Sequence, residues 1–163
     1  MIKDYFNAIP IASELTNFLL NDFEKETLSK LQYDFHDGSV AVSKEHKVLE
    51  DPNLKRVKNF IESKVTEYAR DVICINNSLR MTQSWSTINK KGSRHHTHNH
   101  PNAFVSLVYY VDCDENSGDL VFVVDKNSII LMPGHTKLYL VILVYFQVML
   151  VTIQQCIMVT KIE

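Results

Sequence analysis

The pattern of apolar and polar positions predicts two helices in the first half of the chain. Over residues 11–31, apolar side chains approximate one face of a helix and polar side chains lie elsewhere. Residues 51–72 carry a clearer amphipathic stripe, because apolar residues recur there every three or four positions. Asp51 followed by Pro52 is typical of a helix start, with Asp as the cap and Pro in the first turn. Residues 32–47 are polar and irregular, so we expect a loop there.

From residue 79 onward the pattern becomes typical of strands. Residues 79–89 are rich in Thr, Ser, Trp and Ile. Residues 103–112 are almost continuously apolar, as expected for a strand buried on both faces. Shorter strands are expected at 119–125 and 128–132. The order of elements therefore predicts an α+β fold, in which two N-terminal helices cover one face of a β core.

A cluster of histidines lies between the two longest predicted strands. Four of the seven histidines fall within six positions, namely His95, His96, His98 and His100. If this segment is extended, His96, His98 and His100 point the same way, because side chains alternate between faces. Two such imidazoles and a distant third ligand give the facial arrangement of non-haem Fe(II) sites. A His-rich surface loop or an adventitious zinc site is the alternative interpretation.

Composition narrows the class of protein. A chain of 163 residues with 45% hydrophobic and 22% charged residues predicts one globular domain with a substantial core. A net charge of -2 gives no electrostatic reason to expect nucleic-acid binding. The three cysteines are widely spaced and odd in number, so we expect no disulfide framework and a reducing, cytoplasmic location. The first residues lack the apolar core of a signal peptide.

Several motifs together point to a known family. They are Thr82-Gln83-Ser84-Trp85, Gly92, His98-x-His100-Pro101-Asn102, Ser106, Val108-Tyr109-Tyr110-Val111 and Ser117-Gly118-Asp119-Leu120-Val121-Phe122. Over roughly residues 8–135 the chain resembles the 2-oxoglutarate- and Fe(II)-dependent oxygenases of marine bacteria and their phages. It is more distantly similar to prolyl hydroxylases. In that pattern Asn89 stands in place of a Tyr, and His100 stands in place of a carboxylate ligand.

The resemblance implies a fold, a cofactor and a set of site residues. The implied fold is a double-stranded β-helix, or cupin-like jelly roll, behind two supporting helices. The implied metal is Fe(II), held by His98, His100 and a distal His. The implied cosubstrate is 2-oxoglutarate, for which Asn89 and Tyr110 are the candidate binding residues. Decarboxylation to succinate would accompany hydroxylation of a C–H bond in a small-molecule or peptide substrate, with no part for nucleic acid or membrane.

The last part of the chain departs from this family. Residues 138–153 contain almost no polar break, and the expected Phe-Pro-Ser motif, distal His and 2-oxoglutarate-binding Arg are missing. Reading this tail one base out of step, with permitted codons, restores all three in family order. We therefore expect a reading-frame shift near residues 137–140, and aberrant C-terminal strands. His135 is a weak substitute for the distal His, because it precedes the expected strand.

Two other interpretations of the tail remain. A membrane anchor would need roughly twenty apolar residues and flanking basic residues, and the tail offers sixteen without them. A buried pair of strands also fits this β-branched, apolar composition. The sequence as a whole predicts one domain, 1–163, divided into helical support (1–78), β core (79–135) and atypical tail (136–163). Its function is an oxygenase impaired by the missing ligands or, alternatively, a non-catalytic metal- or small-ligand-binding module.

Overall fold

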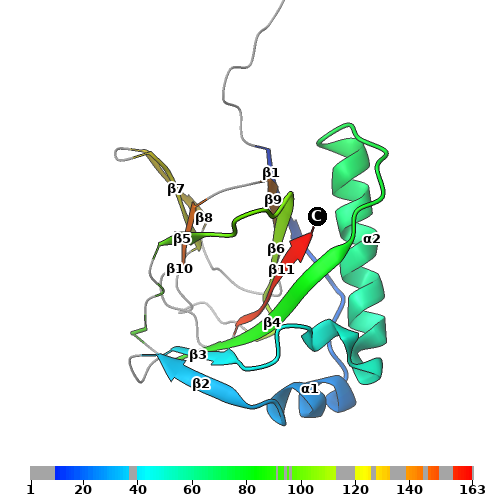
Figure 1. Ribbon diagram of the computed structural model, residues 1–163, viewed down its shortest axis with the longest axis vertical. Helices are drawn as coiled ribbons and strands as arrows, with labels where there is room; N and C mark the ends of the chain where they lie inside the picture. Colours follow the sequence, from blue (N-terminus) through cyan, green and yellow to red (C-terminus); the bar gives the residue numbers. More distant parts are fainter. Residues whose placement is uncertain are drawn as a thin grey trace, which may run out of the picture.

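The computed structural model describes the chain except for residues 1–9, 37–39, 91, 94, 96, 113–119, 126–127, 133–138, 145–146, 151–155 and 163 (Figure 1). Two α-helices and two short 3-10 helices are formed by the first half of the described chain: α1 (Asp22–Ser29), η1 (Val48–Glu50), η2 (Pro52–Leu54) and α2 (Lys55–Asp71). The strands are β1 (Ile11–Leu15), β2 (Tyr33–His36), β3 (Val40–Ser43), β4 (Met81–Asn89), β5 (His98–Asn99), β6 (Val105–Tyr109), β7 (Leu120–Asp125), β8 (Ser128–Met132), β9 (Tyr139–Val144), β10 (Gln147–Leu150) and β11 (Cys156–Ile162).

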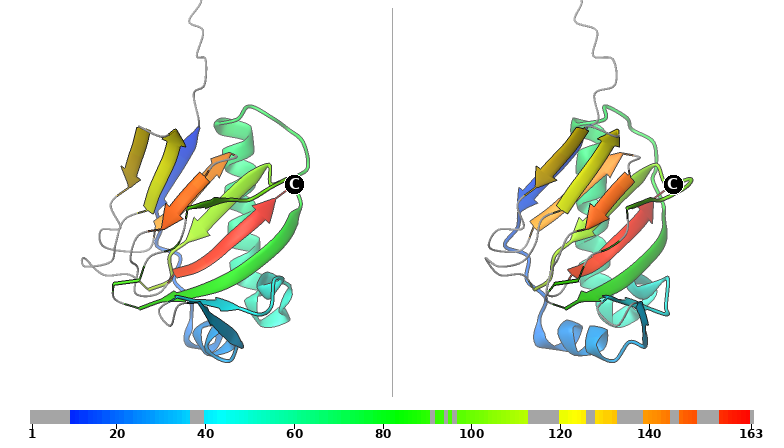
Figure 2. Two further views of the ribbon diagram at one scale, coloured as in Figure 1. Left: turned by 60° about the vertical axis from the view of Figure 1, so that its left-hand side comes forward. Right: turned by 90° about the vertical axis from the view of Figure 1, so that its left-hand side faces the viewer.

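The strands form two antiparallel sheets. The larger sheet has seven strands in the order β1-β9-β6-β11-β4-β3-β2, and the smaller has four in the order β5-β10-β7-β8. Figure 2 shows the two sheets facing each other, with α2 on the outer side of the larger one. The chain passes repeatedly from one sheet to the other, because β4, β6, β9 and β11 belong to the larger sheet and β5, β7, β8 and β10 to the smaller.

The second predicted helix is confirmed. The Asp51 side chain accepts a hydrogen bond from the backbone N–H of Asn53 at 2.8 Å, so it caps the short turn that begins with Pro52. The apolar stripe of α2 then packs against β6 across one hydrophobic core, which includes Val57, Ile61, Val65, Val105 and Leu107. The expected strand pattern of residues 103–112 is also confirmed, because all five residues of β6 are buried.

The prediction of one helix over residues 11–31 is wrong. Residues 11–15 form β1, which pairs with β9 at the edge of the larger sheet. The helix begins only after Asn21, whose side chain accepts a hydrogen bond from the N–H of Glu24 at 2.9 Å. The Glu24 carboxylate accepts one in return from the N–H of Asn21 at 2.8 Å. This reciprocal capping box stops the helix from extending toward β1.

The expected loop at 32–47 is also wrong in part. Residues 33–36 and 40–43 form β2 and β3, an antiparallel pair that continues the larger sheet beyond β4. Apolar residues of this pair do not all face the core, so the segment lacks the regular alternation of a half-buried strand. Phe35, for example, is 60% exposed.

A cluster of aromatic and charged side chains joins the N-terminal segment to α2 and β6. The Phe18 ring stacks on the Phe60 ring of α2 with centroids 4.1 Å apart. The guanidinium group of Arg56 lies over the Phe18 ring, 4.2 Å from its centroid. Tyr109 of β6 donates its hydroxyl proton to the carbonyl oxygen of Phe18. Burial raises the pKa of Tyr109 far above its ordinary value, so this hydroxyl stays a donor.

Among the described helices, none is long and apolar enough to cross a membrane.

The tail forms strands in the centre of both sheets. In the larger sheet, β11 lies between β4 and β6, and β9 lies between β1 and β6. In the smaller sheet, β10 lies between β5 and β7. The described backbone of the tail is therefore stranded, whereas its burial and the frame-shift hypothesis, which concerns the gene, stay predictions.

Candidate metal and ligand site

The histidine segment leaves the larger sheet at the end of β4 and enters the smaller sheet at β5. Gly92 has a φ of +82°, a left-handed conformation that glycine adopts without steric cost. The N–H of Ser93 donates to the carbonyl oxygen of Lys90 at 2.9 Å and closes this turn. The predicted turn at Lys90 and Gly92 therefore lets the chain cross between the sheets just before the histidines.

His98 and His100 lie side by side. Their ring centroids are 5.0 Å apart, and the ring planes are inclined by 81°. Both side chains are half-buried. The alternation of an extended segment predicts this arrangement, because residues two apart share a face. The structure thus brings together the two imidazoles that the sequence indicates as metal ligands.

Two further aromatic side chains extend this pair of rings. Trp85 of β4 lies with its ring centroid 5.3 Å from that of His100. His46, from the loop after β3, lies 6.2 Å from Trp85. Trp85 is half-buried and forms a wall beside His100. His46 is exposed, as expected for a loop histidine.

Asn89 is buried at the end of β4 and joined to the histidine segment. It is 2% exposed, and its side-chain Oδ1 lies 2.7 Å from Nε2 of His95. Its Nδ2 is buried and makes no hydrogen bond within the described part of the chain, and the same is true of the Ser93 hydroxyl. Buried polar groups are nearly always paired, so both atoms are candidates to contact a bound molecule.

Tyr110 directly follows β6 and is buried at 5% exposure. Ser106, four residues earlier, is 3% exposed. By alternation the two residues share the face of β6 opposite to Leu107 and Tyr109, which belong to the core against the helices. That face is the one directed away from α2.

Among the described residues, His98 and His100 are the candidate ligands that lie together. Within that part of the chain, no group of three His, Cys, Asp or Glu side chains could hold a metal ion. His96 and His135, both considered as ligands, lie outside the described residues. In the β5–β10 ladder the residue directly opposite His98 is Val148, which has no donor atom. The chemistry of two neighbouring imidazoles suits two positions of an Fe(II) site, and a third candidate ligand is not found beside them among the described residues.

Sequence reasoning missed two neighbours of this site. His46 meets Trp85 from a loop nearly forty positions earlier, and no local pattern signals that contact. The pairing of His95 with Asn89 could have been anticipated, because a glycine turn between them folds the segment back on the strand.

Comparisons with known proteins identify relatives of this segment. Residues 83–155 match the family described as "Putative 2OG-Fe(II) oxygenase". The resemblance found in the sequence is thereby confirmed, and this family implies Fe(II) as cofactor and 2-oxoglutarate as cosubstrate. The match runs beyond residue 135, into the segment 136–163 that is predicted to be atypical. No curated protein is similar enough in sequence to count as a match.

Solved structures share the fold at low sequence identity. A 2OG-Fe(II) oxygenase family oxidoreductase from Burkholderia pseudomallei is 12% identical with a TM-score of 0.66, covering 85% of this chain and 75% of its own. A prolyl hydroxylase from Trichoplax adhaerens, solved with a hypoxia inducible factor peptide, is 11% identical with a TM-score of 0.57, covering 93% and 81%. A Pseudomonas putida prolyl-4-hydroxylase is 9% identical with a TM-score of 0.56, covering 93% and 90%.

Proposed function

Because the chain matches the 2OG-Fe(II) oxygenases over residues 83–155, we propose that it is a dioxygenase that uses Fe(II) and 2-oxoglutarate to hydroxylate a C–H bond. The observation that carries this proposal is the contact between the His98 and His100 rings, which lie 5.0 Å apart inside the matched segment. Neutral imidazole is a suitable ligand for iron, and two on one face leave other positions open.

We infer that the two sheets form a double-stranded β-helix. The support is the strand order, in which strands from β4 onward alternate between the sheets, except for the β7–β8 pair in the smaller sheet, and β11 returns between β4 and β6. Double-sheet jelly rolls of eight strands have this kind of antiparallel topology. The core strands would then be β4 to β11, and β1, β2 and β3 would extend the larger sheet.

The proposed roles of the protein side chains follow from their chemistry. His98 and His100 would each give one nitrogen to the metal. Bound Fe(II) would carry the redox chemistry with molecular oxygen. The buried Nδ2 of Asn89 is a hydrogen-bond donor that suits a carboxylate oxygen of 2-oxoglutarate. The Tyr110 hydroxyl is the second proposed donor. Burial of Asn89 and Tyr110 keeps water from competing for these bonds.

We propose that turnover by this chain is low. Only two ligands come from the described residues, and the expected distal His and the Arg that would bind the far carboxylate are missing from the sequence. The same observation favours a second candidate function, a non-catalytic module that binds a metal or a small ligand. The two functions differ in order of binding, since an oxygenase site needs the metal before 2-oxoglutarate can chelate it.

The first experiment measures metal binding with Co(II) by equilibrium dialysis and by emission of Trp85, the only tryptophan in the chain. Metal held by His100 would quench this emission, because the two rings lie 5.3 Å apart. We expect His98→Ala and His100→Ala each to weaken binding at least tenfold. His46→Ala is the matched control, because this imidazole also neighbours Trp85. Equal affinity in all four proteins would contradict the metal site.

The second experiment separates the two candidate functions. Under anaerobic conditions, 2-oxoglutarate is titrated with and without Fe(II). Binding that requires Fe(II) supports the oxygenase site, and binding that ignores it supports the module. Succinate release then measures turnover in air, and rapid iron-dependent release would contradict the proposed impairment.

A further inference from the structure

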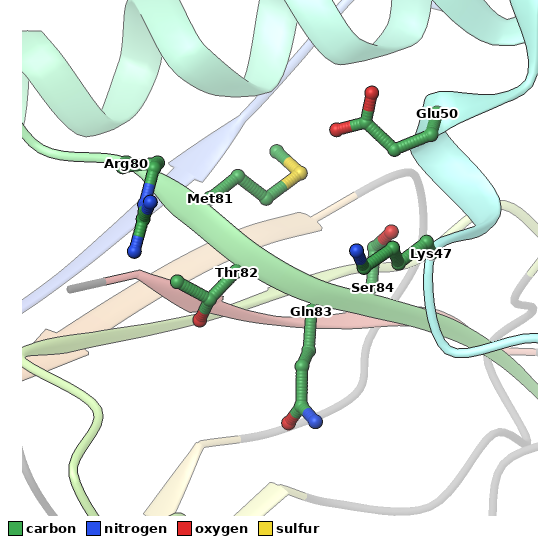
Figure 3. A pocket seen from close by; sticks show the side chains of 7 residues that line it. All are labelled: Lys47, Glu50, Arg80, Met81, Thr82, Gln83 and Ser84. Carbon is green, nitrogen blue, oxygen red and sulfur yellow. The ribbon is translucent and has the colours of Figure 1, made fainter.

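A hollow of about 290 Å³ lies at the start of β4, next to the part of its edge that β3 does not reach (Figure 3). β3 pairs only with residues 87–89 of β4. On this edge of the sheet, the first half of β4 therefore has no neighbouring strand among the described residues. The loop after β3 approaches instead, and the N–H of Ser84 donates to the carbonyl oxygen of His46 at 2.9 Å. The hollow is lined by Lys47, Glu50, Arg80, Met81, Thr82, Gln83 and Ser84.

A bulge directs polar side chains to one side of this hollow. In the β4–β11 ladder, Gln83 is opposite Lys161 and Met81 is opposite Ile162, so Thr82 is an extra residue on β4. Figure 3 shows Thr82 and Gln83 extending together from the strand, away from α2. Bulges commonly redirect a side chain in this way beside functional sites.

The charges around the hollow are mainly positive. Lys47 and Arg80 are exposed, and neither forms an ion pair with any described residue. The one carboxylate in the lining, that of Glu50, is already held by Lys58 at 2.8 Å. Two cations that form no ion pair with another described residue, together with two polar side chains, therefore face a space large enough for a small anion.

The hollow adjoins the candidate metal site. Gln83 and Trp85 share a face of β4, since the ladder is regular between them, and two residues of a strand span about 7 Å. Trp85 in turn contacts His100. A molecule anchored at the hollow could extend over Trp85 toward the two imidazoles.

We propose that this hollow binds the anionic group, a carboxylate or a phosphate, of the substrate. Lys47 and Arg80 supply the charge, and Thr82 and Gln83 supply hydrogen bonds. Arg presents a planar fork of donors that suits both kinds of anion. That the anion belongs to the substrate of an oxygenase rests on the proposed function, whereas anion binding itself does not.

The test uses the full chain without metal and inorganic phosphate as the probe, at constant ionic strength. Backbone amide shifts are followed by NMR in the unaltered protein, in Lys47→Ala, in Arg80→Ala and in Lys55→Ala. The last variant removes the same charge from an exposed position outside the hollow, so it controls for general attraction. We expect saturable shifts at Thr82 and Gln83, with a Kd raised at least fivefold in the first two variants only.

The alternative outcomes are distinct. Shifts spread over all lysine-bearing surfaces, or equal effects of the three substitutions, would show adventitious ion binding and overturn the proposal. Repeating the titration with acetate separates a carboxylate preference from a phosphate preference. Failure here leaves metal binding by His98 and His100 untouched, and loss of metal binding leaves this titration untouched, so the two proposals fail separately.

Discussion

Replacing Val148 by histidine should complete the proposed metal site. Val148 is directly opposite His98 in the β5–β10 ladder. Cross-strand partners of this kind have Cβ atoms about 4.5–5.5 Å apart on the same face. A third imidazole at position 148 would therefore reach the space beside the His98 and His100 rings, which are themselves 5.0 Å apart.

The expected gain in affinity can be estimated. A third nitrogen ligand should strengthen Co(II) binding by about tenfold to a hundredfold, which corresponds to about 1.4–2.8 kcal/mol. Exchanging a β-branched residue within a strand costs up to about 1 kcal/mol of stability. Since this cost is small beside the stability of a folded domain, the variant should remain folded and its metal affinity should be measurable.

The assay is Co(II) titration followed by Trp85 emission and checked by equilibrium dialysis. The matched control is Gln147→His, because position 147 is opposite Asn99 in the register and alternation places it on the other face of the strand. We expect tighter binding for Val148→His and no change for Gln147→His. If the two variants bind alike, or if neither differs from the unaltered chain, either the register of β10 or the role of His98 is wrong.

Three further predictions concern stability. Glu24→Gln should cost about 1–3 kcal/mol at pH 7 in urea unfolding, because the buried carboxylate pairs with Arg56 at 2.5 Å. Burial raises the pKa of Glu24, but the hydrogen bonds from Arg56 and Asn21 outweigh it and leave the pKa below its ordinary 4.5. The loss of stability in Glu24→Gln should therefore be complete above pH 4.5 and fade as the pH falls further. A loss of stability that does not depend on pH would contradict this. Ile61→Ala should cost about 2–5 kcal/mol, since Ile61 is fully buried between α2 and the sheet, and an effect under 1 kcal/mol would mean that this packing is wrong. Tyr109→Phe should cost about 1 kcal/mol through the lost hydrogen bond to Phe18, measured by thermal unfolding, with Tyr33→Phe as a comparison that removes the hydroxyl contact to Ser86.

Sequence patterns predict those elements whose conformation depends on residues close together in the chain. The amphipathic stripe and the Asp51 cap indicate α2 without reference to the rest of the chain. Alternation likewise placed His98 and His100 on one face. In both cases the spacing of a few neighbouring residues determines the geometry, so the sequence alone is enough to predict the element or the shared face.

Elements that depend on distant partners were not predictable in this way. Residues 11–15 are a strand because β9 is available to pair with them, and their composition alone fits a helix equally well. The contact of His46 with Trp85 depends on the path of the loop after β3. The capping box of Asn21 and Glu24 is a local signal for the true helix start, and the apolar periodicity of residues 11–31 conceals it.

The place of β11 between β4 and β6 has a consequence for synthesis of the chain. Until residues 156–162 have left the ribosome, β4 and β6 have no shared neighbour, and their facing edges are open to other chains. Closure of the larger sheet must therefore await synthesis of β11, and any pause before that point lengthens the time during which these edges can pair with another chain.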